Sequence, residues 1–348
     1  MSKPILGIIG GGQLGSMLAI AANKLEIKTV IFCDDIDAPA QNFSNDFVHG
    51  EYNDKNKINE FLSKVDVVTY EFENIPYETL NEINKIKPVL PKPSVNRIIQ
   101  HRLAEKDFIN NLNIRTTRYV SIEKKSEMDP VEDLLPGILK TTTLGYDGKG
   151  QHPINSLENL DSIDVDYSKG YILEKLVKLK KEISIIITRF GNQKYEIYEP
   201  IENVHEDQIL KNSKIPAEIS DKILEQSKLW ATTIAEELKY VGTLCVEFFI
   251  DRNDNLYVNE IAPRVHNSGH LTINAYNVSQ FENHVRAVCK LEQIPLKKIS
   301  NAMMTNIIGD QITNYRNKEH NENEFFFDYL KKEIKQKRKM GHLTTLLK

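Results

Sequence analysis

The sequence predicts an α/β domain, then an antiparallel α+β domain, then a small C-terminal module. Strand-like and helix-like segments alternate over the first hundred residues, whereas from Arg118 onward the strands follow one another as antiparallel neighbours. The length of 348 residues also exceeds that of one average domain. We therefore expect domains over 1–98, 99–300 and 301–348, with a lid at about 118–180 and a core at about 181–300 inside the second.

The first domain has the pattern of a doubly wound parallel sheet. Apolar and β-branched residues predict strands at Ile5–Ile9, Thr29–Phe32, Val65–Tyr70 and Val89–Leu90. Helices are expected between these strands, after Gln13, near Lys55–Ser63 and after Pro76, and helical segments from Ser94 to Leu112 lead out of the domain.

The second domain is expected to be mostly antiparallel. Strands are predicted at Gly137–Lys140 and Gly170–Glu174, on either side of a glycine-rich loop, and again at Glu182–Phe190 and Tyr195–Ile201. An amphipathic helix of about 20 residues should follow, because apolar residues recur there at helical spacing: Ile219, Ile223, Trp230, Ile234 and Leu238.

The composition is that of a globular protein without a general affinity for polyanions. Hydrophobic residues make up 40% of the chain, charged residues 27%, and the net charge is −4, so neither nucleic acid nor an anionic membrane is an expected partner. Three cysteines without metal-site spacing predict reduced, buried thiols. The N-terminus lacks the long apolar region of a signal peptide, and no apolar run approaches the roughly 20 residues of a membrane span. We expect a cytoplasmic protein.

Glu247 and Glu260 are the most informative pair of residues. They lie in two strand-like segments, Gly242–Asp251 and Leu256–Ile261, which a turn separates. If Asn253-Asp254 form that turn, or if the loop spans Arg252–Asn255, Glu247 lies directly opposite Glu260. Opposed carboxylates repel each other unless a cation lies between them, and Mg²⁺ prefers such oxygen ligands. The alternative is an exposed hairpin on which both side chains point to water.

Gly10-Gly-Gly-Gln-Leu-Gly15 follows the first strand and matches the dinucleotide-binding pattern, with Asp34 and Asp35 about twenty residues further on. By itself this pattern favours an NAD-dependent oxidoreductase. The alternative is a tight strand-to-helix turn whose amides hold another anionic or polar ligand. Nothing downstream resembles a hydride-transfer site, so we favour the second interpretation.

A second glycine-rich segment, Thr141–Gln151, lies between two strands and is neither a Walker loop nor a Rossmann loop. Its glycines allow the backbone to approach phosphates closely, and Lys140 would supply a positive charge to the same phosphates. The alternative is a plain flexible hairpin. Further on, the backbone of Glu174–Val177 could bind an adenine edge and Glu182 a ribose, unless these are ordinary surface glutamates.

Polar residues gather after the glutamate hairpin, in Asn259–His270, a segment with the proline and glycine of a loop. Arg264 could hold a small oxyanion bidentately beside the metal. A lone histidine here would more often be structural, but five such side chains beside paired carboxylates indicate a site: Arg264, His266, Asn267, Ser268 and His270. The basic run Lys331–Lys339 is interpreted as a phosphate-binding wall, with a solvated helix face or a nucleic-acid tail as alternatives.

Several of these segments, in order over nearly the whole chain, closely resemble motifs of the N5-carboxyaminoimidazole ribonucleotide synthetase family, ATP-grasp enzymes of purine biosynthesis. The matching segments are Gly10–Gly15, Thr69–Pro76, Gly145–Gln151, Asn259–Arg264, His266–His270 and Arg338–His342. The resemblance implies an ATP-grasp fold with an N-terminal Rossmann-like preATP-grasp domain and a small C-terminal module. It also implies that ATP and bicarbonate form carboxyphosphate, which carboxylates 5-aminoimidazole ribonucleotide, and that the protein is a homodimer.

The resemblance also assigns residues to roles. The expected magnesium ligands are Glu247 and Glu260, and the expected catalytic residues are Arg264, Lys140 and Asp147. The implied ATP site comprises Arg102, Lys140, Gly145, Tyr146, Asp147, Gly148, Lys149, Gly150, Gln151, Glu174, Lys175, Leu176, Val177, Glu182, His205, Asn259 and Glu260. The implied ribonucleotide site comprises Gln13, Leu14, Glu71, Tyr146, Asp147, Arg264, His266, Asn267, Lys331 and Arg338.

The chain departs from the family pattern at Ser16, Val265 and Leu271, where relatives often carry Arg, Pro and Trp, and at Leu330 and Gln336. We expect these changes to affect loop geometry and stability more than the reaction type. Three alternatives stay open at this point. They are a formate-dependent ligase of the glycinamide ribonucleotide transformylase type, an NAD-dependent oxidoreductase, and a catalytically silent nucleotide-binding regulator.

Overall fold

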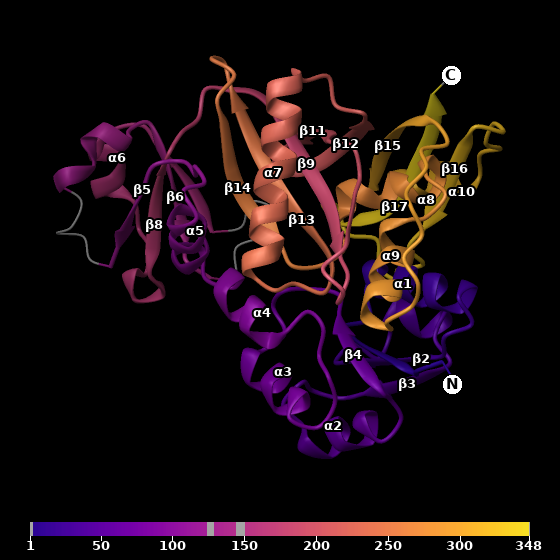
Figure 1. Cartoon of the computed structure of the whole chain (residues 1–348). Helices are drawn as coiled ribbons and strands as arrows, with labels where there is room; N and C mark the ends of the chain where they lie inside the picture. Colours follow the sequence, from indigo (N-terminus) through magenta and orange to yellow (C-terminus); the bar gives the residue numbers. More distant parts are fainter. Residues whose placement is uncertain (1–2, 124–128, 144–149, 348) are drawn as a thin grey trace.

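The computed structural model describes residues 3–123, 129–143 and 150–347. Figure 1 shows a parallel sheet at the bottom of the view and a small antiparallel sheet at the left. A long sheet runs from the centre to the right, so that the yellow C-terminal strands lie far from the lid.

The N-terminal sheet has the strand order β3-β2-β1-β4 and is parallel throughout, as predicted. Val89 extends it through a single parallel bridge to Val68. β3 was missed by the sequence analysis, because only one of its four side chains is buried and its composition resembles that of a loop. The elements are β1 (Leu6–Ile9), α1 (Gln13–Lys24), β2 (Thr29–Cys33), η1 (Pro39–Asn42), β3 (Asp46–His49), α2 (Lys55–Leu62), β4 (Val67–Tyr70) and α3 (Tyr77–Asn84).

Two helices, α4 (Pro93–Ile99) and α5 (Arg102–Asn111), lead to the lid sheet, whose order is β5-β8-β6-β7. β6 and β7 pair antiparallel, so the glycine-rich segment connects the two strands of a hairpin. Most of that segment, residues 144–149, lies outside the described residues. The lid elements are β5 (Tyr119–Ile122), η3 (Asp129–Leu134), β6 (Gly137–Thr141), β7 (Gln151–Ile154), α6 (Leu157–Ser162), η4 (Tyr167–Lys169) and β8 (Tyr171–Lys175).

The long sheet has the order β14-β13-β9-β11-β12-β15-β17-β16, with β10 paired to β9. The predicted amphipathic helix is α7, which packs Ile223 and Ile234 on the core strands. The sheet is built from β9 (Leu179–Arg189), β10 (Tyr195–Ile197), β11 (Ile201–Glu206), β12 (Ile209–Ile215), β13 (Gly242–Asp251), β14 (Leu256–Ala262), β15 (Asn301–Ile308), β16 (Glu324–Asp328) and β17 (Lys339–Leu347). The remaining elements are α7 (Asp221–Glu237), η5 (Asn267–Leu271), α8 (Thr272–Ala275), α9 (Gln280–Val288) and α10 (Gln311–Arg316).

Helix α9 joins the N-terminal domain to the core, because it packs against both α1 and β13. Phe281 and Val285 of α9 share an apolar cluster with Leu14 and Leu18 of α1. His284 adds polar contacts, since its Nε2 lies 2.8 Å from the Thr69 hydroxyl and its Nδ1 accepts from the Thr243 amide at 3.0 Å. These contacts hold the β1–α1 turn beside the core sheet, which is where the cavity forms.

The three cysteines, all in the described part of the chain, are buried free thiols, as predicted. Across residues 3–123, 129–143 and 150–347, none of the helices has both the length and the apolar character that crossing a bilayer would require.

Candidate active site

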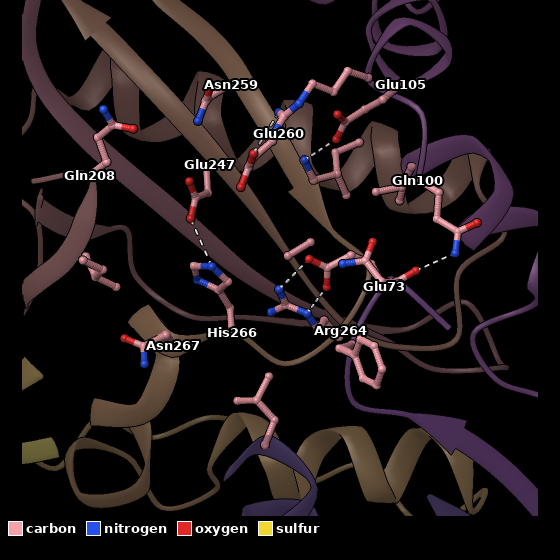
Figure 2. A pocket seen from close by; sticks show the side chains of 18 of the residues that line it. Glu73, Gln100, Glu105, Gln208, Glu247, Asn259, Glu260, Arg264, His266 and Asn267 are labelled. Atoms are coloured by element: carbon pink, nitrogen blue, oxygen red, sulfur yellow. Dashed lines mark hydrogen bonds and ion pairs between the residues drawn. The ribbon is translucent and has the colours of Figure 1, made fainter. Parts of the chain in front are cut away.

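A cavity of about 730 Å³ lies where the N-terminal domain, the lid and the core sheet meet. Figure 2 shows it with acidic and basic side chains directed inward from opposite walls. Predicted site residues from all three regions line it: Gln13, Leu14, Glu71, Arg102, Gln151, Glu182, His205, Glu247, Asn259, Glu260, Arg264, His266 and Asn267. Other lining residues were not predicted from the sequence, among them Glu73, Gln100, Glu105 and Gln208, whereas Lys339 ends the predicted basic run.

Glu247 and Glu260 lie opposite each other on β13 and β14, as predicted, but the register is reached differently. The loop has three residues, 252–254, one more than the expected two-residue turn and one fewer than the expected four-residue loop, because the Asp251 N–H donates to the Asn255 carbonyl at 3.0 Å. A β-bulge between Glu247 and Phe248 then shifts the pairing by one residue and restores the opposition of the two glutamates. Both carboxylates line the cavity, and the Glu247 side chain is only 13% exposed, so the alternative in which both point to water is wrong.

A third carboxylate, Glu105 of α5, joins this acidic pair. Its Oε1 accepts the backbone N–H of Ile261 at 2.6 Å, directly beside Glu260. Burial, together with the charge of Glu260, raises the pKa of both Glu105 and Glu247 to about 8. Arg102 offers partial compensation, with Nη1 3.6 Å from Oε2 of Glu260. The nearby cations therefore do not offset the cost of ionising these groups, and without a bound metal Glu105 and Glu247 hold their protons at neutral pH.

His266 contacts Glu247 directly, with Nε2 3.1 Å from Oε1. Its Nδ1 accepts the backbone N–H of Ser268 at 3.3 Å, so the ring hydrogen lies on Nε2 and is donated to Glu247. Burial, reinforced by the charge of Arg264, lowers the pKa of His266 well below its ordinary value, so the ring is neutral.

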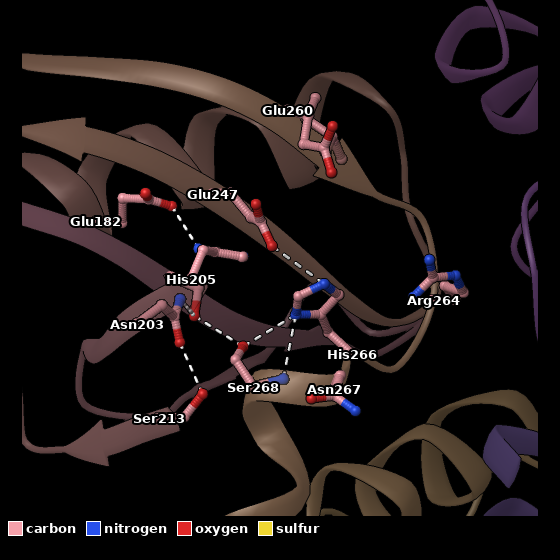
Figure 3. Close-up of polar contacts among 12 residues, drawn as sticks. Glu182, Asn203, His205, Ser213, Glu247, Glu260, Arg264, His266, Asn267 and Ser268 are labelled. Carbon is pink, nitrogen blue, oxygen red and sulfur yellow. Dashed lines mark hydrogen bonds and ion pairs between the residues drawn. The ribbon is translucent and has the colours of Figure 1, made fainter. Parts of the chain in front are cut away.

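A chain of hydrogen bonds supports His266 from behind (Figure 3). Its Nδ1 lies 2.9 Å from the Ser268 hydroxyl, which lies 2.8 Å from that of Ser184 on β9. Asn203 on β11 donates to Ser184 at 3.0 Å and accepts from Ser213 at 2.8 Å. The sequence analysis missed the three strand residues of this chain. Ser184 stands between buried isoleucines, and a lone polar residue in an apolar strand was the available signal.

Beside this network, Glu182 and His205 form a contact of their own, with Nδ1 2.8 Å from Oε2. Burial alone would lower the pKa of His205, but the Glu182 carboxylate outweighs burial and raises it. The two side chains therefore pair at the wall of the cavity that β9 and β11 form.

Arg264 binds a protein carboxylate with the donors that we expected to hold an oxyanion. Its Nε lies 2.5 Å from Oε2 of Glu73, its Nη2 lies 3.1 Å from Oε1, and its Nη1 donates to the Val265 carbonyl at 3.1 Å. Burial would raise the pKa of Glu73, but Arg264 outweighs it and the pKa is lowered. Glu73 therefore occupies the bidentate position, and one N–H remains on each of the two terminal nitrogens of Arg264.

The glycine turn after β1 holds the carboxylate of Glu71. The amides of Gly12 and Gly15 donate to its two oxygens. A Cβ added at Gly10 would lie 2.5 Å from Cγ of Glu71, and one at Gly12 would lie 2.9 Å from Oε1, so the glycines make room for this side chain. The carboxylate lies where a dinucleotide fold would bind a pyrophosphate, which contradicts the NAD interpretation.

Lys140 and Glu174 lie beside the cavity and do not line it. Both are buried, and Nζ of Lys140 lies 3.1 Å from Oε2 of Glu174. The same oxygen lies 3.3 Å from Nζ of Lys106 and accepts from the Thr117 hydroxyl at 3.0 Å. Burial would raise the pKa of Glu174, but the two lysines outweigh burial and lower it to about 2. The alternative that Glu174 is an ordinary surface glutamate is therefore wrong.

Other predicted residues also lie off the cavity wall or outside the described residues. Among the described ones, Gly150, Lys175, Leu176, Val177, Lys331 and Arg338 do not line the cavity. Lys331 donates to the Lys339 carbonyl at 2.8 Å, and Arg338 donates to that of Glu333 at 3.3 Å. Of the described basic run Lys331–Lys339, only Lys339 lines the cavity, and the phosphate-binding role of the run stays a prediction. The predictions for Gly145, Tyr146, Asp147, Gly148 and Lys149 fall outside the described residues.

Comparison with known families finds three matches along the chain. The ribonucleotide synthetase preATP-grasp domain matches residues 2–100, and the ATP-grasp domain matches residues 107–281. The phosphoribosylaminoimidazole carboxylase C-terminal domain matches residues 302–348.

Individual relatives match over nearly the whole length. A protein of Staphylococcus aureus (strain MRSA252) named N5-carboxyaminoimidazole ribonucleotide synthase is 37% identical over 347 residues, 98% of this chain and 92% of that protein. The crystal structure of an ADP complex of N5-carboxyaminoimidazole ribonucleotide synthetase gives a TM-score of 0.94 at 34% identity, covering 100% of this chain and 94% of that one. The synthase of Aspergillus clavatus, solved with ADP and 5-aminoimidazole ribonucleotide, gives a TM-score of 0.90 at 28% identity, covering 99% and 94%.

Proposed function

Because the chain belongs to the N5-carboxyaminoimidazole ribonucleotide synthase family of ATP-grasp ligases, we propose that its cavity binds Mg²⁺, ATP and the ribonucleotide together, with Glu247 and Glu260 at the centre. The chain is an ATP-dependent ligase of purine biosynthesis that forms N5-carboxyaminoimidazole ribonucleotide. The alternatives raised from the sequence are not favoured by these relatives. The observation that carries the proposal is the opposition of two glutamates in a cavity to which all three regions of the chain contribute.

The residues at this position fit Mg²⁺. Glu247 and Glu260 present carboxyl oxygens from adjacent strands, and Glu105 places a third carboxyl group beside them, whose ionised form a bound cation would favour. Glu247 and Glu260 would hold Mg²⁺, which would supply positive charge against the charge that develops on the phosphates of ATP. His266 keeps the Glu247 carboxylate in place through the 3.1 Å contact with Nε2.

ATP is proposed to lie between the lid and the core sheet. The side chains that would meet it there are Arg102, Gln151, Glu182, His205 and Asn259, all of which line the cavity. Lys140 and Lys106 add two positive charges next to this space but share one carboxylate, Glu174. We propose that this surplus positive charge attracts the phosphates, and that the glycine-rich hairpin connection closes over them and excludes water.

The proposed chemistry has two steps. A bicarbonate oxygen attacks the γ-phosphorus of ATP, the bond to the β-phosphate oxygen breaks, and ADP leaves carboxyphosphate in the site. The amine of 5-aminoimidazole ribonucleotide then bonds to the carboxyl carbon, inorganic phosphate leaves, and the amine loses a proton. Arg264, anchored by Glu73, directs its remaining N–H groups at the oxygens of bicarbonate and carboxyphosphate.

The test is ADP release measured with and without 5-aminoimidazole ribonucleotide and bicarbonate. We expect release to require both compounds, and formate should not replace bicarbonate. Glu260→Gln should reduce ADP release by a factor on the order of 1,000 while the circular dichroism spectrum is unchanged, because the metal loses one of its two anionic ligands. Near-normal ADP release by Glu260→Gln would contradict the assignment of Glu260 as a magnesium ligand.

We further propose that the protein is a homodimer in the cytoplasm. The three free thiols suit a reducing compartment. Light scattering during size-exclusion chromatography would measure the oligomeric state directly, and a monomer mass near 40.0 kDa would contradict the dimer.

A further inference from the structure

Cys245, Glu247 and His266 bring three kinds of metal ligand together, and the proposed reaction has no use for the thiol. One ligand atom from each residue lies within 4.8 Å of the other two. Cys245 and Glu247 are two residues apart on β13 and therefore share a face of the strand, while His266 approaches from the segment after β14. The cross-strand partner of Cys245 is Ala262, which itself lines the cavity.

The spacing of the polar ligands is close to that of a bound ion. Zn²⁺ lies about 2.0–2.2 Å from imidazole nitrogen and carboxylate oxygen, so at a tetrahedral angle these two atoms are roughly 3.4 Å apart. Nε2 of His266 and Oε1 of Glu247 are 3.1 Å apart already. An ion could therefore replace the hydrogen between them with little movement of either side chain.

The atoms behind the ligands also suit a metal site. A histidine that binds a metal through one nitrogen usually donates its other N–H to an oxygen, which fixes the ring. When Nε2 binds an ion, the ring hydrogen moves to Nδ1, which gives up the 3.3 Å bond from the Ser268 backbone N–H and donates instead to the Ser268 hydroxyl at 2.9 Å. Ser268 is in turn held by Ser184 at 2.8 Å, so the ring orientation required by the ion is already present.

The ligand chemistry selects against Mg²⁺. Mg²⁺ prefers six oxygen ligands and keeps several waters, whereas a thiolate, an imidazole and a carboxylate are typical of Zn²⁺. We propose that Cys245, Glu247 and His266 form an inhibitory site for a thiophilic divalent cation, Zn²⁺, which overlaps the proposed Mg²⁺ site at Glu247. On binding, the Cys245 thiol bonds to the metal as thiolate and its proton passes to solvent.

The burial of the three residues gives the order of contact. Glu247 and His266 line the cavity with side chains 13% exposed, whereas Cys245 is fully buried. An ion entering from the cavity meets the carboxylate and the imidazole first and the thiol last, which leaves its fourth position toward the cavity. The metal binding is independent of the proposed function, and only the inhibition rests on Glu247 being a magnesium ligand.

The first experiment uses Co²⁺ as a spectroscopic probe, with the full chain and without nucleotide. A cobalt ion bound to thiolate gives a ligand-to-metal charge-transfer band in the near ultraviolet, and Zn²⁺ should displace it. We expect the band in the unmodified chain, no band in Cys245→Ala, and the full band in Cys289→Ala, which removes a buried thiol elsewhere. Absence of the band from the unmodified chain, or its persistence in Cys245→Ala, would overturn the site.

The second experiment measures Zn²⁺ affinity by competition with a chromophoric chelator, and inhibition of ADP release at saturating Mg²⁺. Cys245→Ala should bind Zn²⁺ at least about tenfold more weakly, because loss of a ligand exceeds the effect of losing an outer-shell partner. Its basal activity should remain, and its inhibition by Zn²⁺ should need correspondingly more metal. A cobalt band that depends on Cys245 without any inhibition by Zn²⁺ would overturn the overlap with the Mg²⁺ site.

Discussion

Two clusters of ionisable side chains meet at α5. Glu105 and Lys106, which are consecutive in that helix, belong to different clusters. Lys106 joins Lys140 around the carboxylate of Glu174, whereas Glu105 joins Glu247 and Glu260 in the cavity. We call the first the lysine cluster (Lys106, Lys140, Glu174) and the second the acidic cluster (Glu105, Glu247, Glu260). In the lysine cluster every charge has an opposite partner within 3.3 Å, and in the acidic cluster like charges face one another.

The pKa shifts of Glu174 and Glu247 run in opposite directions because the groups next to them carry charges of opposite sign. The carboxyl groups of Glu105, Glu174 and Glu247 lose solvation on burial, which by itself raises their pKa. In the lysine cluster two cations reverse the effect, and the pKa of Glu174 falls to about 2. In the acidic cluster Glu260 adds to the effect, and the pKa of Glu247 rises to about 8. The lysine cluster carries surplus positive charge, and the acidic cluster holds carboxyl groups whose ionisation a bound cation would favour, so the two would complement a nucleotide's phosphates and a metal.

The largest change in the free energy of unfolding should come from replacing the carboxylate of the lysine cluster by an amide. Glu174→Gln leaves Lys106 and Lys140 buried without an anion, so the free energy of unfolding at pH 7 should fall by about 3–5 kcal/mol. Urea unfolding followed by fluorescence measures it. Glu218→Gln, in an exposed pair with Lys214, is the control and should leave the free energy of unfolding nearly unchanged. A loss no larger than the control's would mean that the lysines are solvated.

The same variant has a predictable dependence on pH. The folded-state pKa of Glu174 is lowered, from 4.5 to about 2, so its stabilising effect is fully present above about pH 4.5 and is lost as the pH falls toward 2. The difference in unfolding free energy between the unmodified chain and Glu174→Gln should therefore shrink between pH 4.5 and pH 2. A constant difference across this range would show that Glu174 is not held as a carboxylate.

In the acidic cluster, replacing a carboxyl group by an amide should raise the free energy of unfolding of the metal-free protein instead of lowering it. Glu247→Gln removes a carboxyl group whose folded-state pKa is raised from 4.5 to about 8, a shift that destabilises the folded state above about pH 4.5, so the metal-free variant should be more stable at pH 7. Mg²⁺ should raise the melting temperature of the unmodified chain, because it binds the folded state, and should have little effect on the variant. Thermal unfolding with and without Mg²⁺ tests both statements, and a destabilised metal-free variant would contradict the account of like-charge repulsion.

The acidic cluster was the easier of the two to predict from sequence. Glu247 and Glu260 lie on one hairpin, so turn signals and strand composition sufficed. Even there the expected turn was misplaced, and the bulge next to Glu247 restored the opposition. A bulge leaves little trace in composition, because one extra residue in a strand preserves its apolar content.

The lysine cluster and the anchoring of Arg264 could not be predicted in the same way. Lys140 and Glu174 are 34 residues apart on β6 and β8, so their contact depends on the pairing of these strands within the lid sheet. Arg264 and Glu73 are 191 residues apart, so their contact depends on how the domains pack. Glu73 lies inside a motif that supported the family resemblance, yet no local pattern indicated which cation it would meet. Similarly, the glycine turn after β1 indicated an anion correctly, but that anion is the Glu71 side chain of the same chain.

The smallest predicted effect concerns how the acidic cluster is held. Ser268→Ala removes the hydroxyl that links His266 to Ser184, so the free energy of unfolding should fall by about 1 kcal/mol. The Mg²⁺ affinity of the protein should also weaken a few-fold, because the His266 ring that contacts Glu247 loses its support. Ser227→Ala, which removes an equally buried hydroxyl bonded only within α7, is the matched control. It should lose comparable stability with no change in the Mg²⁺ concentration that gives half-maximal ADP release. If both variants shift that concentration equally, the serine chain stabilises the sheet in general and does not orient Glu247.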